Sequence, residues 1–187
     1  MDRPNELFEL AQKIADERPT FFDKKGPGIG DRDTSKFMEE LKKRTKDKFG
    51  CNLAEKLICR DNKSTVDFYF REEETIVEVA LSLHNSLSEF EKDIIKAILA
   101  VQVGGHPVKK LLFVSKPEAE KRHEEPLSRS IISWVKKDYG IEVEIKELTH
   151  LQSRKPSIVD LETTGLNPSS DRRFATSKDI QIEVAFR

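Results

Sequence analysis

The chain has 187 residues, which is enough for one domain with a full hydrophobic core and a short appendage. Hydrophobic residues make up 36% of the sequence and charged residues another 36%, so we expect a small core beneath a heavily charged surface. The 33 basic and 34 acidic residues give a net charge of -1, which excludes a global attraction to nucleic acid and requires a local basic patch for any such binding.

The sequence favours a soluble cytoplasmic protein. Its two cysteines, Cys51 and Cys59, form no Cys-x-x-Cys pair, so we expect free thiols and no zinc knuckle. The first ten residues, MDRPNELFEL, contain no apolar signal core, and no apolar run approaches the length that spans a membrane.

Two helices are predicted at the start of the chain. Residues 5–17 carry apolar side chains at helical spacing, and Pro19 follows this helix. A second helix is predicted at 35–49, with Thr34 or Ser35 as its N-cap and Gly50 at its C-terminal end. Its charged face, KKRTKDK, is typical of a solvated surface, with a contact to a phosphate backbone as the alternative.

Strands and helices alternate in the rest of the domain. Strands are predicted at 54–60, 65–71, 75–83, 109–115 and 141–148, and helices at 88–102 and 126–138. Ser88 and Glu91 form a predicted capping box for the first of these helices. The expected inward residues are Phe90, Ile94, Ala97, Ile98 and Val101 in one helix, and Leu127, Ile131, Trp134 and Val135 in the other.

This order, α-α-βββ-α-β-α-β, predicts an α/β fold with a mixed central sheet and helices on both faces. We expect one domain over residues 1–150, with the helix at 5–17 packed on it. Residues 151–187 form a C-terminal extension that is predicted to add a β-hairpin.

The segment STVDFYFREEETIVEVALSLHN, residues 64–85, reads as two strands joined by an acidic turn. A turn centred on Glu72 and Glu73 places Asp67 directly opposite Glu78, with β-carbons about 5 Å apart. Opposed carboxylates destabilise a sheet and raise a carboxyl pKa, and a hard divalent cation such as Mg²⁺ removes both effects. The alternative is an exposed edge on which the two acids serve solubility alone.

These residues and this element order resemble the PD-(D/E)XK nuclease superfamily over residues 35–148. Asp67 matches the first acid of the family motif, and Glu78-Val79-Ala80 matches its (D/E)-x-K tripeptide. The resemblance implies a restriction-endonuclease-like core that hydrolyses DNA with Mg²⁺ or Mn²⁺ held by Asp67 and Glu78. It also implies a further acid from the preceding helix, for which Glu40 is the candidate and Glu39 its neighbour.

The departure from the family is Ala80, which stands where the motif has its lysine. Some members of the family take a lysine from the following helix, where this chain has Lys92 and Lys96, one helical turn apart. Each of these lysines faces either the acid pair or water. His84 and Asn85, just beyond the second strand, are further residues that can approach the site, although a simple hydrogen-bonding role is more common for a histidine there.

Two alternatives to a nuclease remain open. The same fold without hydrolysis would serve as a nucleic-acid-binding or assembly module, and Ala80 and the near-zero net charge favour this. An unrelated α/β domain would carry the hairpin acids by coincidence. A homodimer would suit cleavage of duplex DNA, but no pattern in the sequence indicates one.

A second local resemblance lies near the C-terminus. The segment IVDLETTGL, residues 158–166, resembles the first motif of the DEDD 3′–5′ exonucleases through Asp160, Glu162 and Thr163-Thr164-Gly165. That family needs further acids downstream, so with the chain ending at Arg187 we expect no exonuclease activity of that type. The segment is then a chance match, a remnant or part of a truncated fusion. The plain interpretation is a strand, a turn and a final strand.

Overall fold

The computed structural model describes residues 2–18, 21–22, 30–59, 64–83 and 87–150. The predictions for 151–187, including Asp160 and Glu162, and those for His84 and Asn85 lie outside these residues. Within the described residues, strands β1 (Ala54–Cys59), β2 (Ser64–Phe70), β3 (Thr75–Val79), β4 (Lys110–Ser115) and β5 (Glu142–Glu147) form one sheet in that order. β1, β2 and β3 are antiparallel neighbours, whereas β3, β4 and β5 are parallel, so the predicted mixed sheet is confirmed.

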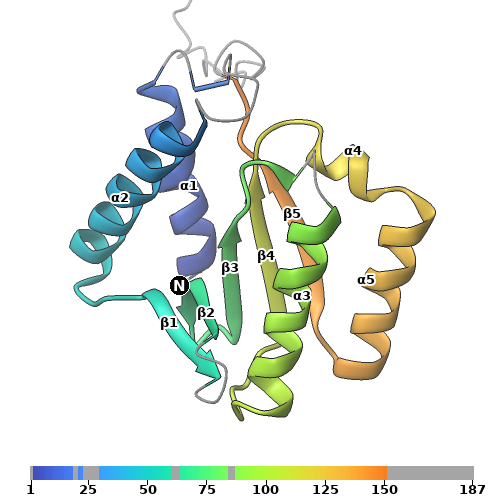
Figure 1. Ribbon diagram of the computed structural model, residues 1–187. Coiled ribbons are helices and arrows are strands. Elements are labelled where there is room, and N and C mark those ends of the chain that lie inside the picture. Colours follow the sequence, from blue (N-terminus) through green and yellow to red (C-terminus); the bar gives the residue numbers. More distant parts are fainter. Residues whose placement is uncertain (1, 19–20, 23–29, 60–63, 84–86, 151–187) are drawn as a thin grey trace, which may run out of the picture. The chain divides into compact units, whose positions relative to one another are not determined.

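Helices cover both faces of this sheet (Figure 1). The described helices are α1 (Arg3–Asp16), α2 (Gly30–Phe49), α3 (Leu87–Gln102), α4 (Ala119–His123) and α5 (Pro126–Tyr139). α1 and α2 lie on one face, and α3, α4 and α5 on the other. Parallel strands need a crossover between them, and α3 supplies it from β3 to β4 while α4 and α5 supply it from β4 to β5.

Alternating side chains divide the core into two layers. Phe68, Val77 and Val79 pack with Leu7 and Phe37 on the side of α1 and α2. Tyr69, Ile76, Ala80 and Phe113 instead join a second cluster with Phe90, Ile94 and Ala97 of α3. Side chains at positions 67 and 78 alternate with those of the first cluster, so they belong to the face that α3 covers.

Several predicted boundaries were wrong. α2 begins at Gly30, so neither Thr34 nor Ser35 is its N-cap, although Gly50 does end it in the left-handed conformation with φ +67°. α3 begins at Leu87, which places Ser88 inside the helix and removes the predicted capping box. β3 ends at Val79 because the chain turns at Leu81–Leu83, and the short helix α4 was not predicted.

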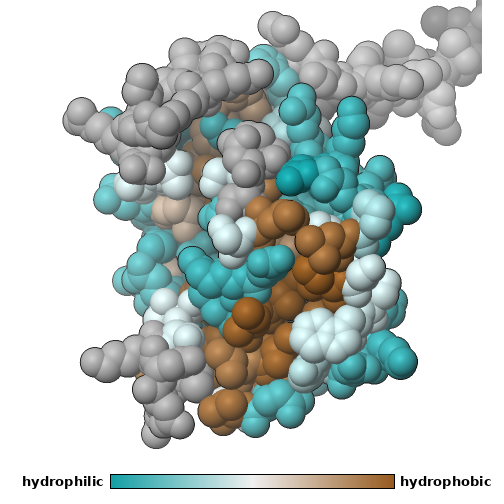
Figure 2. Space-filling model, turned by 45° about the vertical axis from the view of Figure 1, so that its right-hand side comes forward, coloured by the Kyte–Doolittle hydropathy of each residue, from teal (hydrophilic) through white to brown (hydrophobic). Residues whose placement is uncertain are grey.

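The outward face of α3 and α5 is more apolar than the sequence predicted. Val135 is buried as expected, but Leu127 and Trp134 are 56% and 46% exposed. Ile95 of α3 is 55% exposed, and hydrophobic side chains gather on this side of the molecule in Figure 2. The 3.6-residue period marks an apolar stripe that is wider than the part of α5 in contact with the sheet. None of the described helices is both long and apolar enough to cross a membrane.

Candidate active site

The candidate site forms where β2 and β3 stop pairing. Phe68, Tyr69 and Phe70 pair with Val77, Ile76 and Thr75, so the numbers of each pair sum to 145, as a turn centred on Glu72 and Glu73 requires. One further step of this register sets Asp67 against Glu78. Backbone-to-backbone pairing ends before that step, and hydrogen bonds to the two carboxylates replace it.

Each carboxylate accepts a hydrogen bond from the backbone of the opposite strand. The Val79 N–H donates to Asp67 Oδ2 at 2.8 Å, and the Asp67 N–H donates to Glu78 Oε2 at 3.2 Å. Backbone donors within a sheet need acceptors, and here side-chain oxygens replace the missing ladder carbonyls. The two acids are therefore part of the fold at this point as well as candidate ligands.

Helix α3 places a lysine and a third acid against this pair. Lys96 Nζ donates a hydrogen bond to Glu78 Oε1 at 3.1 Å and lies 2.7 Å from Asp93 Oδ1. The second contact is a short ion pair between the ammonium group and the Asp93 carboxylate. Glu78 and Asp93 are 2% and 5% exposed, so this charged group is largely shielded from water.

Burial and mutual repulsion make the acids hard to ionise. Burial, followed by the charges of Asp67 and Asp93, raises the pKa of Glu78 to about 8, against the opposing effect of Lys96. Burial also raises the pKa of Asp67, although the hydrogen bond from Val79 acts in the other direction. For Lys96, burial alone would lower the pKa, but the charges of Glu78 and Asp93 outweigh it and raise the pKa.

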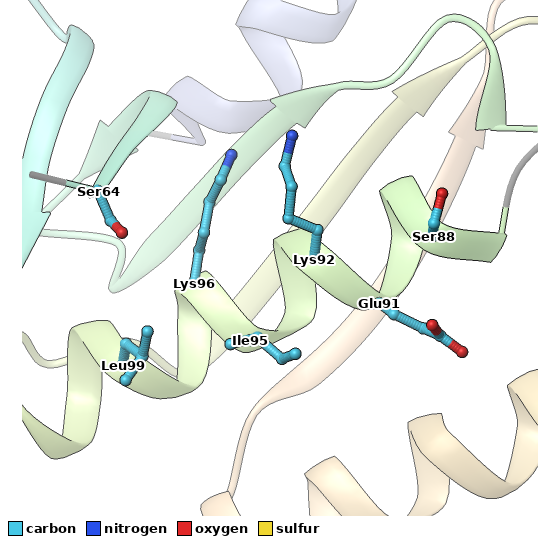
Figure 3. Close-up of a pocket in the computed structure, with 7 residues that line it drawn as sticks. All are labelled: Ser64, Ser88, Glu91, Lys92, Ile95, Lys96 and Leu99. Atoms are coloured by element: carbon cyan, nitrogen blue, oxygen red, sulfur yellow. The ribbon is translucent and has the colours of Figure 1, made fainter. Parts of the chain in front are cut away.

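A surface hollow of about 430 Å³ opens beside Lys96 along α3. Lys92, Lys96, Glu91 and Ile95 line it from the helix, and Ser64 lies at the start of β2. Lys92 and Lys96 extend from α3 in the same direction, toward the sheet, while Glu91 points away (Figure 3). Of the two predicted lysines, Lys96 contacts the acids, whereas Lys92 lines the same hollow and is exposed.

Ala80, which stands where the resembled motif has a lysine, lies in the core and not at the surface of the site. Ala80 is 2% exposed and packs in the cluster beneath α3. Its carbonyl oxygen accepts a hydrogen bond from Ser115 Oγ at 2.7 Å, which fixes the end of β3 to β4. A long cationic side chain at this position would enter the core, whereas α3 delivers an ammonium group from outside the sheet.

Glu40, the predicted further acid, does not join the site. It lies on α2, which packs on the opposite face of the sheet, and it accepts a hydrogen bond from Arg44 Nε at 2.7 Å. Arg44 also binds Glu17, and Glu39 is exposed. Lys42 and Lys48 of the same helix pair with Glu55 and Glu6, which supports the interpretation of KKRTKDK as a solvated face.

Asp93 was missed because its position does not follow the predicted motif. The available signal was an acid inside the apolar stripe of a helix, three residues after Phe90 and three before Lys96. In the part of the chain that the structure describes, no three histidine, cysteine, aspartate or glutamate side chains are arranged to hold a metal ion together. A metal at this site would thus rest on Asp67 and Glu78, with water completing its coordination.

Comparison with known proteins adds no relative. No family model matches the chain, and neither a curated protein nor a solved structure matches it. The function of this chain is therefore inferred from the geometry of the site itself.

Proposed function

We propose that this chain is a Mg²⁺-dependent nuclease that hydrolyses phosphodiester bonds in DNA. Asp67 and Glu78 are the proposed metal ligands. Lys96 is the proposed replacement for the motif lysine, whose position is occupied by Ala80. The observation that carries the proposal is the 3.1 Å hydrogen bond from Lys96 Nζ to Glu78 Oε1. A lysine from the helix after β3 thereby reaches the second acid of the sheet.

The donor set suits a hard divalent cation. Three carboxylates, those of Asp67, Glu78 and Asp93, face a single ammonium group, so full ionisation leaves two uncompensated negative charges in a largely buried place. Protonation of Glu78 relieves this repulsion, and so does a divalent cation, which prefers carboxylate oxygen ligands. When bound, such a cation supplies an activated water and stabilises charge on the phosphate.

The residues of the chain would have separate tasks in this reaction. Asp67 and Glu78 hold their oxygens at the gap between β2 and β3, where backbone N–H groups orient both carboxylates. The Lys96 ammonium group has N–H donors besides the one in the hydrogen bond to Glu78. These can orient a water molecule or a phosphate oxygen. Lys92, which lines the same hollow and is exposed, would contact the phosphate backbone.

Cleavage assays with matched substitutions test this proposal. Supercoiled, linear and single-stranded DNA would be incubated with the native chain in Mg²⁺, in Mn²⁺ and in EDTA. Lys96→Met should lower the cleavage rate about a hundredfold or more, in the range reported for removing a positioned catalytic group. Lys137→Met, at an exposed position of α5, is the matched control and should keep the native rate.

Asp67→Asn also controls for purity, because cleavage by a contaminating nuclease would persist in a preparation of this variant. Metal-dependent cleavage that disappears in Asp67→Asn and Lys96→Met supports the proposal. An absence of cleavage by the native chain on all three substrates, or equal cleavage by Asp67→Asn, contradicts it.

A second candidate function is DNA binding without hydrolysis. The observation that favours it is that Asp67 Oδ2 and Glu78 Oε2 already accept backbone hydrogen bonds and that Lys96 occupies Glu78 Oε1. Titration calorimetry with Mn²⁺ separates the two candidates. Binding that both Asp67→Asn and Glu78→Gln abolish favours the nuclease, whereas DNA binding with no metal binding favours the module.

A further inference from the structure

We propose that Asp93 is a positioning residue that holds the Lys96 ammonium group over Glu78. This inference rests on the proposed nuclease function for its catalytic consequence. It goes beyond that function because Asp93 belongs to neither the sheet acids nor the lysines of the resemblance.

Asp93 lies in a buried, apolar location, which is unfavourable for a carboxylate without a structural or functional role. It lies on the core side of α3 beside Phe90, Ile94 and Ala97 and is 5% exposed. A buried carboxylate is costly unless a cation accompanies it, and an apolar side chain would suit this stripe better. The ion pair that the structure describes for Asp93 is the one with Lys96, at 2.7 Å.

Two anchors fix the end of a flexible side chain. Lysine carries its charge on a four-carbon stem with many rotamers, so a single contact leaves the ammonium group free to turn toward solvent. Glu78 holds Lys96 Nζ from the sheet, and Asp93 holds it from the same helix, three residues earlier. Lys92, one turn before Lys96 on the same side of α3, is exposed and provides an internal comparison.

The expected catalytic effect is a loss of orientation and not a loss of substrate binding. Misplacement of a reacting group by about 1 Å can cost up to roughly a hundredfold in rate. Asp93→Asn should therefore lower kcat about tenfold or more while leaving KM near the native value. Asp93→Glu, which restores the charge on a longer side chain, should recover part of the lost rate.

Chemical labelling measures the positioning without any reference to catalysis. Trace acetylation with acetic anhydride, followed by mass spectrometry, gives the relative reactivity of Lys92 and Lys96 in the folded full-length chain. Asp93→Asn should raise the acetylation rate of Lys96 severalfold and leave that of Lys92 unchanged. Asp138→Asn, the same change at an exposed position of α5, should alter neither rate.

Asp93→Leu keeps the test decisive if the asparagine variant does not fold, because leucine suits the apolar stripe. An unchanged Lys96 acetylation rate in the folded variants would overturn the inference, and so would a native kcat in Asp93→Asn. A native chain that cuts no DNA contradicts the proposed function instead, and the labelling rates then still decide whether Asp93 holds Lys96.

Discussion

The Glu78 carboxylate accepts a hydrogen bond from the backbone N–H of Asp67, at 3.2 Å, across the gap where β2 and β3 stop pairing. The side chain of Glu78 on β3 is thus linked to the backbone of Asp67 on β2. Lys96 adds its hydrogen bond to the same carboxylate from α3. Glu78 therefore contacts both the neighbouring strand and helix α3, and it is also one of the two proposed metal ligands.

The stability of the fold should decrease as pH rises from about 5 to 8. Because the pKa of Glu78 is raised to about 8 in the folded chain, the native state keeps a proton that the unfolded state has released. The free energy of unfolding should fall by up to about 1.4 kcal/mol per pH unit in this window. The raised pKa of Asp67 acts in the same direction, whereas the raised pKa of Lys96 matters only at strongly alkaline pH. Burial lowers the pKa of His123 below its ordinary 6.5, which opposes the fall in the lower part of this window, so the clearest fall is expected between pH 6.5 and 8.

Urea unfolding at half-unit pH steps measures this slope. Glu78→Gln should flatten it, because the amide stays neutral at every pH, and the variant should be more stable than the native chain above pH 8. Glu124→Gln, at an exposed site, should keep the native pH dependence. A native curve that does not fall between pH 6.5 and 8 would contradict the raised pKa of Glu78.

Divalent cations should stabilise the native chain more at pH 8 than at pH 6. Protons and the cation compete for Glu78, so the apparent affinity should be roughly tenfold or more weaker at the lower pH. At a cation concentration a hundred times the dissociation constant, the gain is about 2.7 kcal/mol. Thermal unfolding with and without Mn²⁺ at both pH values measures it.

Asp67→Asn and Glu78→Gln should each lose the Mn²⁺-dependent rise in Tm. Lys137→Met should retain it, as a substitution remote from the acids. Equal stabilisation of the native chain and of both acid variants would place the cation elsewhere on the protein and would count against the proposed ligands.

The sequence predicted the sheet better than it predicted the surroundings of the site. Hydrophobic alternation and the Glu72-Glu73 turn set the register that opposes Asp67 and Glu78, because register is determined locally in a hairpin. The choice between Lys92 and Lys96 was not available, since both lie off the predicted stripe and only the crossing of α3 over β3 decides it. Asp93 was missed although its spacing from Phe90 and Ala97 places it in the buried stripe of α3, because an acidic residue is ordinarily assigned to the surface.

Ala80→Lys, which introduces a lysine where the resembled motif has one, should destabilise the fold instead of improving the site. Ala80 is 2% exposed in the cluster beneath α3, so a lysine must either displace core side chains or bury its charge. The free energy of unfolding should fall by about 2 kcal/mol or more. Ser82→Lys, at an exposed position two residues later, should change it by less than about 1 kcal/mol. Urea unfolding of both variants provides the comparison, and a stable Ala80→Lys chain would show that position 80 opens toward the site.

Glu74→Gly should stabilise the hairpin that carries both acids. Glu74 closes the turn with its N–H bonded to the Arg71 carbonyl at 3.2 Å, and its φ of +50° is unfavourable for a residue with a side chain. Glycine removes this strain and keeps the backbone bonds that the Glu74 carbonyl accepts from Lys109 and Lys110. The ion pair that is lost joins Glu74 to Lys109, whose side chain is 73% exposed, so it contributes little.

We expect Glu74→Gly to raise the free energy of unfolding by up to about 1 kcal/mol. The control Arg71→Gly, at a position without positive φ, should lower it by about 0.5 kcal/mol or more. Equal losses in the two variants would contradict the strained turn.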